Sequence, residues 1–185
     1  MTKSQNCYGS MDEIDFSTAL ARLLRDVELR ERFAQSPAAI AAQLRVRSTE
    51  RDAFAALSVE ELEVQAHILL RKRFDAVRHM IPATMDRLGS SAWKSFLEHA
   101  RSSWPKPPSM DVQDTRSFCV HLAATQPTVL CRSELNRLHF HLGKQAVAMH
   151  WVGDLWVRGR PRRAFQIFIR RGQRWSERSL YWSLG

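Results

Sequence analysis

The sequence predicts an α+β fold, in which an N-terminal helical bundle is followed by a C-terminal three- to four-stranded antiparallel sheet. Two observations lead to this prediction. Apolar residues recur every three to four positions as far as Leu142, and after Gly143 the period changes to two. One proline-rich segment, Trp104 to Ser109, interrupts the helical part.

The first predicted helices lie between Asp15 and Leu57. An apolar stripe with helical spacing runs from Leu20 to Phe33. Ser36-Pro37 is typical of a helix start, because serine can cap a helix and proline suits its first turn. Several short helices are therefore expected in this part of the chain.

The clearest helix is predicted to begin at Ser58 and to end before Pro82. Ser58 and Glu61 have the spacing of a capping box. One face is apolar from Leu62 to Ile81, and Pro82 should then break or kink the helix. A short helix closed by Gly89 and another over residues 92–104 are expected to follow.

The segment from Trp104 to Ser109 contains three prolines within four residues. Such a segment is stiff and extended, so it is the predicted boundary between two domains. We expect a helical domain at residues 11–105 and a helix-plus-sheet domain at residues 111–185. Asp111 or Asp114 is expected to cap the first helix of the second domain, and Ser133 its last.

The C-terminal segment alternates apolar and polar residues and is divided by turn signals. Gly153-Asp154 is predicted to form a turn, and Gly159 and Pro161 to break a short strand. A tight hairpin is expected at residues 171–173. The predicted strands are 147–152, 155–157, 165–169 and 175–182.

Positive charge is concentrated in the same segment. The chain has a net charge of +9. Residues 144–185 contain nine Lys and Arg and two acids, so this segment alone carries +7. A local basic surface indicates an acidic partner, which could be a nucleic acid, an acidic peptide or an acidic protein face. A merely solvated arginine-rich surface is the simpler alternative.

The cysteines and the N-terminus indicate the compartment. The three cysteines, Cys7, Cys119 and Cys131, are odd in number and widely spaced, which predicts neither a disulfide framework nor a zinc site. The first residues lack a signal-peptide pattern, and no apolar run approaches the roughly 20 residues that span a bilayer. We expect a cytoplasmic protein without a membrane partner.

No catalytic, cofactor-binding or metal-binding residue is predicted. The glycines stand singly and form no phosphate-binding loop. His139 and His141 would point about 200° apart on a helix and could not share a metal ion there. Cys119 lies among apolar residues and is expected to be a small buried side chain. The chain is therefore not expected to be an enzyme.

A partner-binding surface is predicted on the basic sheet. Four tryptophans share this segment with eight arginines, and both residue types are enriched at interface hot spots, although about two of the tryptophans should simply fill the core. The arginines around Pro161 are expected on a loop beside a sheet edge, where an extended peptide can add as a strand and arginines can select its acidic side chains. The predicted peptide-binding and partner-binding residues are Trp156, Arg158, Arg160, Arg162, Arg163 and Arg170.

The helical half carries a series of short phrases in a characteristic order. They are Leu23-Leu24-Arg25-Asp26, Leu29-Arg30 with Phe33, Gln65-Ala66, Leu69-Leu70-Arg71-Lys72-Arg73, Pro82-Ala83-Thr84, Leu88-Gly89, Phe96 and Trp104-Pro105. The pattern covers residues 20–105 and resembles the partner proteins, or C components, of multinuclear non-haem iron oxidases in methanobactin biosynthesis. Helices followed by a three-stranded sheet also resemble a peptide-leader recognition element.

This resemblance implies a function. It implies that the chain forms a heterodimer with an iron-dependent oxidase and binds the leader of a ribosomally made precursor peptide. The oxidase would then use oxygen to convert precursor cysteines into the oxazolone and thioamide groups of a copper chelator. It also implies that the iron belongs to the oxidase and not to this chain. The resemblance fixes no individual contact residue.

Two other functions are alternatives to this one. A nucleic-acid-binding regulator with a basic, winged-helix-like C-terminal domain would need a basic recognition helix before the sheet. The predicted helix from Ser133 to Leu142 contains only Arg137, which is few cations for phosphate contacts. No group of residues has the spacing of a catalytic motif, so the sequence does not support a small independent enzyme.

Overall fold

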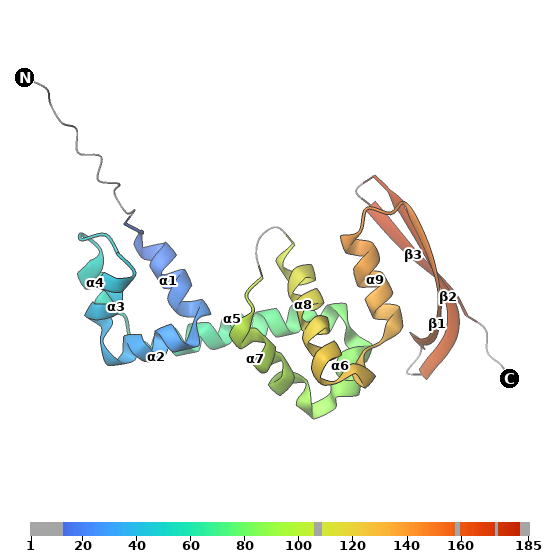
Figure 1. Cartoon of the computed structure of the whole chain (residues 1–185), viewed down its shortest axis with the longest axis horizontal. Helices are drawn as coiled ribbons and strands as arrows, with labels where there is room; N and C mark the ends of the chain where they lie inside the picture. Colours follow the sequence, from blue (N-terminus) through green and yellow to red (C-terminus); the bar gives the residue numbers. More distant parts are fainter. Residues whose placement is uncertain (1–12, 106–108, 158–159, 173, 182–185) are drawn as a thin grey trace, which may run out of the picture. The chain divides into compact units, whose positions relative to one another are not determined.

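The computed structural model describes residues 13–105, 109–157, 160–172 and 174–181. The side chains of Trp156, Pro161 and Tyr181 are not among the described parts. The chain divides into two compact units, Met1–Leu69 and Leu70–Gly185. Helices dominate the described residues, and a three-stranded antiparallel sheet follows them in the chain (Figure 1). The predicted α+β class is confirmed.

The first unit contains four short helices and the beginning of a long one. These are α1 (Phe16–Arg25), α2 (Val27–Gln35), α3 (Pro37–Gln43), α4 (Arg51–Ala55) and the first half of α5 (Val59–Met80). The predicted apolar stripe is divided between α1 and α2 at Asp26, whose backbone is extended and whose carboxylate accepts from the Leu29 amide at 3.0 Å. Phe33 and Phe54 meet edge to face in the core, with ring centroids 5.6 Å apart.

The long helix α5 begins and ends where the sequence predicts. The Ser58 hydroxyl accepts a hydrogen bond from the Glu61 amide at 3.3 Å, as in a capping box. Pro82 starts the next helix, α6 (Pro82–Leu88), and Gly89 closes it with a φ of 55°, a conformation that favours glycine.

The second unit contains the other helices. They are α6, η1 (Gly89–Ser91), α7 (Ala92–Ser102), α8 (Met110–Thr125), η2 (Pro127–Val129) and α9 (Arg132–Leu142). The proline-rich segment therefore lies within this unit and not at the division between units, because α7 and α8 on either side of it pack around the same core as the end of α5.

Two predicted helix caps are wrong. Asp114 lies inside α8 and points into the core, where it is 2% exposed, and Asp111 lies in the first turn and not at the cap. Ser133 lies inside α9, which begins one residue earlier. The first two amides of α9 donate instead to the carboxylate of Asp154, at 2.6 and 3.2 Å.

The sheet consists of β1 (Val147–Val157), β2 (Arg160–Arg171) and β3 (Arg174–Tyr181), in that order. The predicted strands 147–152 and 155–157 are one strand, because Gly153-Asp154 forms a bulge and not a turn. The predicted loop after Val157 is also shorter than expected, and Arg160 already pairs with Val157. Gly172, with a φ of 62°, lies in the predicted hairpin between β2 and β3.

One face of the sheet packs against α9 (Figure 1). Phe168 of β2 stacks on Phe140 of α9 at a centroid distance of 5.1 Å, and Gln166 beside it is fully buried. The Gln166 side chain accepts a hydrogen bond from Asn136 and donates one to the carbonyl of Ser133.

None of the described helices is both long and apolar enough to cross a membrane.

Candidate functional site

Three of the predicted peptide-binding arginines lie together, and one lies far from them. Arg160, Arg162 and Arg163 lie at the start of β2, which is the central strand and not a loop. Arg170 lies eight residues beyond Arg162 on the same strand, which corresponds to about 27 Å. Trp156 pairs with Pro161 at the near end, but its side chain and all of Arg158 lie outside the described residues.

The three neighbouring arginines do not share one face of the sheet. Arg162 pairs directly with the buried Leu155 and is half-buried on the face toward α9. Successive side chains of a strand point to opposite faces, so Arg163, which is exposed, lies on the other face. A single peptide could therefore contact all three only by passing around the end of the sheet.

Arg170 already has partners within the chain. Its guanidinium lies over the Phe140 ring at 5.1 Å and donates to the carbonyls of Phe140 and His141 at the end of α9. A cation at the C-terminus of a helix satisfies its free carbonyls and complements its dipole. Arg170 thus has a structural role, and its contact with a peptide stays a prediction.

The β3 edge of the sheet contacts α9 and borders a cleft that no local sequence pattern predicts. The cleft has a volume of about 30 Å³. Its lining comes from α5, α9 and β3 and consists of Met80, Glu134, Arg137, Leu138, His141 and Trp175. The only sequence signal for it was the aromatic character of Trp175.

The cleft's polar side chains are held in place by hydrogen bonds. Arg137 of α9 binds Glu177 of β3 through two contacts, at 2.6 and 3.2 Å. These hydrogen bonds hold the pKa of Arg137 above its ordinary value, although burial opposes them. The Trp175 indole donates to Nδ1 of His141 at 3.0 Å, so that ring nitrogen acts as an acceptor. The edge and the helix are therefore already joined in a defined geometry.

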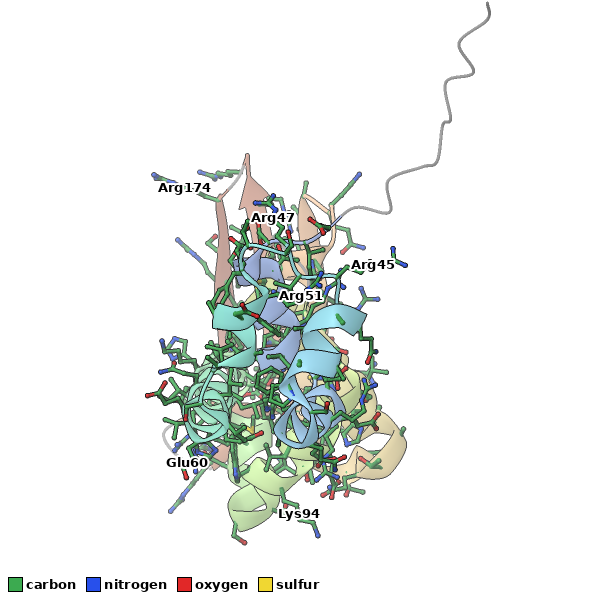
Figure 2. All side chains as sticks on the ribbon, turned by 90° about the vertical axis from the view of Figure 1, so that its left-hand side faces the viewer. Arg45, Arg47, Arg51, Glu60, Lys94 and Arg174 are labelled. Atoms are coloured by element: carbon green, nitrogen blue, oxygen red, sulfur yellow. The ribbon has the colours of Figure 1, made fainter. Side chains whose placement is uncertain are left out.

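The strands around this cleft carry an excess of positive charge. Strands β2 and β3 contain seven arginines and one carboxylate, Glu177, which is already paired with Arg137. Arg174 extends from the end of the sheet (Figure 2). An acidic ligand would be attracted to this surface, and the attraction would weaken with added salt.

Among the cysteines and histidines that could act as nucleophiles or metal ligands, Cys119 and Cys131 are buried. Burial raises the pKa of the Cys119 thiol to about 12 and also raises that of Cys131. His139 is exposed, whereas His141 is half-buried against Trp175, as expected for ordinary histidines. Within the described part of the chain, no three His, Cys, Asp or Glu residues are grouped so that they could hold a metal ion.

A second polar cluster lies in the core of the same unit. Asp114 accepts from Arg73 at 2.8 and 2.9 Å and contacts Nε2 of His99 at 3.1 Å. All three side chains are less than a tenth exposed, so this Asp-His pair has no access to a substrate and joins α5, α7 and α8.

No protein-family model, curated protein or solved structure matches this chain.

Proposed function

We propose that this chain is a non-catalytic partner subunit that forms a heterodimer with an iron-dependent oxidase and binds the leader of a ribosomally made precursor peptide. The oxidase holds the iron and modifies the precursor's cysteines to oxazolone and thioamide groups, as in methanobactin biosynthesis. This chain captures the leader and adds no catalytic group.

The observation that carries this proposal is the β3 edge beside α9. An extended leader adds to β3 as an antiparallel strand, and main-chain hydrogen bonds supply affinity. The cleft between α9 and Trp175 takes one small apolar side chain of the leader. Because Arg137 and Glu177 already fix the helix against the strand, little ordering is needed on binding.

The arginines contribute selectivity for an acidic leader. Arg160, Arg162 and Arg163 lie at the start of β2, and Arg174 and Arg178 lie on the edge strand itself. Guanidinium groups bind carboxylates with two parallel hydrogen bonds, which favours Asp and Glu over other side chains. The helical half is assigned to contact with the oxidase.

Co-expression tests this function. The chain is produced with a cognate iron-loaded oxidase and its precursor peptide, and the peptide is analysed by co-purification and by mass. We expect stable co-elution of the chain with the oxidase, and a change in peptide mass that requires both proteins. Full modification of the peptide by the oxidase alone, with no co-elution of this chain, would contradict the proposal.

A pair of triple variants tests the role of the arginines. Replacing Arg160, Arg162 and Arg163 with Ser is expected to weaken leader binding by about tenfold or more at low salt. The matched control replaces three exposed arginines of the first unit, Arg22, Arg45 and Arg47, with Ser; Figure 2 shows Arg45 and Arg47. If the two variants bind the leader with equal affinity, these arginines do not contact the leader, and the β3 edge alone stays the candidate site.

Nucleic-acid binding is the alternative, and the geometry supports it less well. In a winged helix the recognition helix presents cations to the major groove. Here α9 packs against the sheet, and its Arg137 is engaged by Glu177. Salt-dependent retention on DNA, together with no binding to the leader, would favour this alternative.

A further inference from the structure

The sheet has a second face, which points away from α9 (Figure 1). Residues directly opposite each other in neighbouring strands share a face. Because Val152, Ala164 and Phe168 are buried on the α9 side, the alternate positions point outward. This outer face consists of Val147, Met149 and Trp151 of β1, Phe165, Ile167 and Ile169 of β2, and Ser176, Arg178 and Leu180 of β3.

The outer face is apolar and open to solvent. Met149 is 63% exposed, Leu180 60% and Val147 58%. Trp151 is 50% exposed, and its ring meets that of Phe165 edge to face at 4.8 Å. A contiguous apolar surface of this kind is typical of an interaction site, because water against it is unfavourable.

Arginines surround this apolar centre. Arg163 lies outward at one end of β2, Arg171 and Arg174 lie directly opposite each other at the other end, and Arg178 lies on the edge strand. All four are exposed, and no described residue forms an ion pair with any of them. Two like charges in direct cross-strand contact are unfavourable unless an anion joins them.

Carboxylates are turned away from this face. Among the described residues of the sheet, the acids are Asp154 and Glu177, and both bind α9 on the opposite side. The outer face is therefore complementary to a surface with an apolar centre and acidic ends. A second copy of the chain would bring arginines against arginines and is electrostatically disfavoured.

The dimensions of the face fit an α-helix. The apolar part spans about 13 Å along the strands and about 10 Å across them, and a helix with its side chains is about 10 Å wide. From Arg163 to Arg171 the distance along β2 is about 27 Å, which is the length of a helix of about 18 residues.

We propose that the outer face of the sheet docks a partner protein through an amphipathic helix that has an apolar stripe and Asp or Glu residues in its first and last turns. The cations of β2 and β3 are all arginines, which are enriched in protein interfaces where lysines are depleted. The outer face is distinct from the β3 edge and its cleft, although Arg163, Arg174 and Arg178 also serve the leader-binding proposal. Variants of the outward apolar side chains Met149 and Leu180 therefore distinguish failure of this proposal from failure of leader binding.

A designed peptide tests the proposal with the full chain. An 18-residue helix with leucines along one stripe and glutamates in its end turns is titrated into the ¹⁵N-labelled protein at physiological salt. Saturable binding should shift the amide signals of outward residues on β1 to β3. The same peptide with lysines in place of the glutamates should bind at least about tenfold more weakly. Equal binding of the two peptides would overturn the proposal.

Surface variants locate the binding. The double variant Met149→Ser, Leu180→Ser removes two exposed apolar side chains and should lower the peptide's affinity by about tenfold or more. The control is Val64→Ser, Val120→Ser, which removes two equally exposed apolar side chains, 57% and 64%, from helices α5 and α8. Circular dichroism checks that both variants keep the native helix content.

Other occupants of the face give distinct results. A concentration-dependent dimer in sedimentation that Met149→Ser, Leu180→Ser abolishes would show that a second copy covers the face. Stronger binding to vesicles of phosphatidylcholine and phosphatidylglycerol than to the acidic peptide, lost in the same variant, would show a membrane surface. Either result would overturn the helix-docking proposal. Monomeric protein that binds the acidic peptide but not the vesicles would support it.

Discussion

Replacing Asp114 by Asn should destabilise the second unit far more than an ordinary surface change. Asp114 is 2% exposed, and Arg73 is 9% exposed. Among the described residues, Asp114 is the only carboxylate paired with the Arg73 guanidinium. Removing the charge leaves a buried cation without a counter-ion, a change that costs about 3–5 kcal/mol. The Asn carbonyl can still accept one of the two Arg73 hydrogen bonds, so we expect a loss of about 3 kcal/mol.

Urea unfolding measures this loss. With a slope of about 2 kcal/mol per molar urea, the midpoint should fall by about 1.5 M. Asp111→Asn is the matched control, because Asp111 is exposed in the first turn of the same helix and should contribute less than about 1 kcal/mol through the helix dipole. If the two variants unfold at the same urea concentration, the buried ion pair does not stabilise the fold by this amount.

The pH dependence provides a second check on Asp114. Burial alone would raise its pKa, but hydrogen bonds from Arg73 and His99 outweigh burial and lower the pKa below its ordinary value of 3.8. A carboxyl with a lowered pKa in the folded state stabilises that state above its unfolded pKa, and this contribution is lost as the pH falls through the folded value. The stability difference between the native protein and Asp114→Asn should therefore be constant near neutral pH and shrink below pH 3.8.

Three further predictions concern the second unit. Asp154→Ala should cost about 1–2 kcal/mol and speed amide hydrogen exchange in the first turn of α9, because both capping bonds are lost; unchanged exchange would contradict the capping role. In a Cys7→Ser background, Cys119 and Cys131 should react with a thiol reagent at pH 8 only after unfolding, since burial raises both pKa values; rapid labelling of the native protein would refute this. Trp175→Phe keeps an aromatic side chain but loses the indole N–H and its hydrogen bond to α9, and thermal unfolding should reveal a loss of at least about 1 kcal/mol.

Local signals in the sequence were sufficient for most of the elements. The Ser58 capping box, the break at Pro82 and the positive-φ glycines at positions 89 and 172 each act within a few residues. The change of period after Gly143 depends on the alternation of side chains in a strand, which is also local. These features identified the α+β class without information on contacts between distant residues.

Helix caps that come from distant residues cannot be predicted from local sequence patterns. Sequence patterns suggest caps from adjacent residues, but two helices of the second unit are capped from far along the chain. Glu134 accepts from the amides of Ala83 and Thr84 at 2.7 and 2.9 Å and so caps α6 from 51 and 50 residues away. Burial raises the Glu134 pKa more than these hydrogen bonds lower it. Asp154 likewise caps α9 from the bulge in β1, in place of the predicted Ser133.

The sequence alone placed the candidate site on the basic sheet but did not show where on the sheet it lies. Gly159 and Pro161 suggested a loop, yet Pro161 lies second in β2, near the strand start, where proline is tolerated. The arginines were therefore assigned to a loop although they belong to the central strand. The cleft at β3 could not be predicted, because it depends on the packing of α9, whose contacts with Glu177 and Arg170 join residues 30 to 40 positions apart.

The way in which α9 is fixed explains how a small sheet can present a ready-made edge. Charged residues of the sheet hold the helix at three points: Asp154 at its N-terminus, Glu177 through Arg137 in its middle, and Arg170 at its C-terminus. The acid and the base at the two ends each match the sign that the helix dipole favours. The register of α9 against β3, and with it the shape of the cleft, is therefore set by directional contacts and not by apolar packing alone. Under the proposed function, a peptide that adds to this edge would meet residues that folding has already ordered. Its main-chain hydrogen bonds would then contribute to affinity with little loss of entropy in the protein.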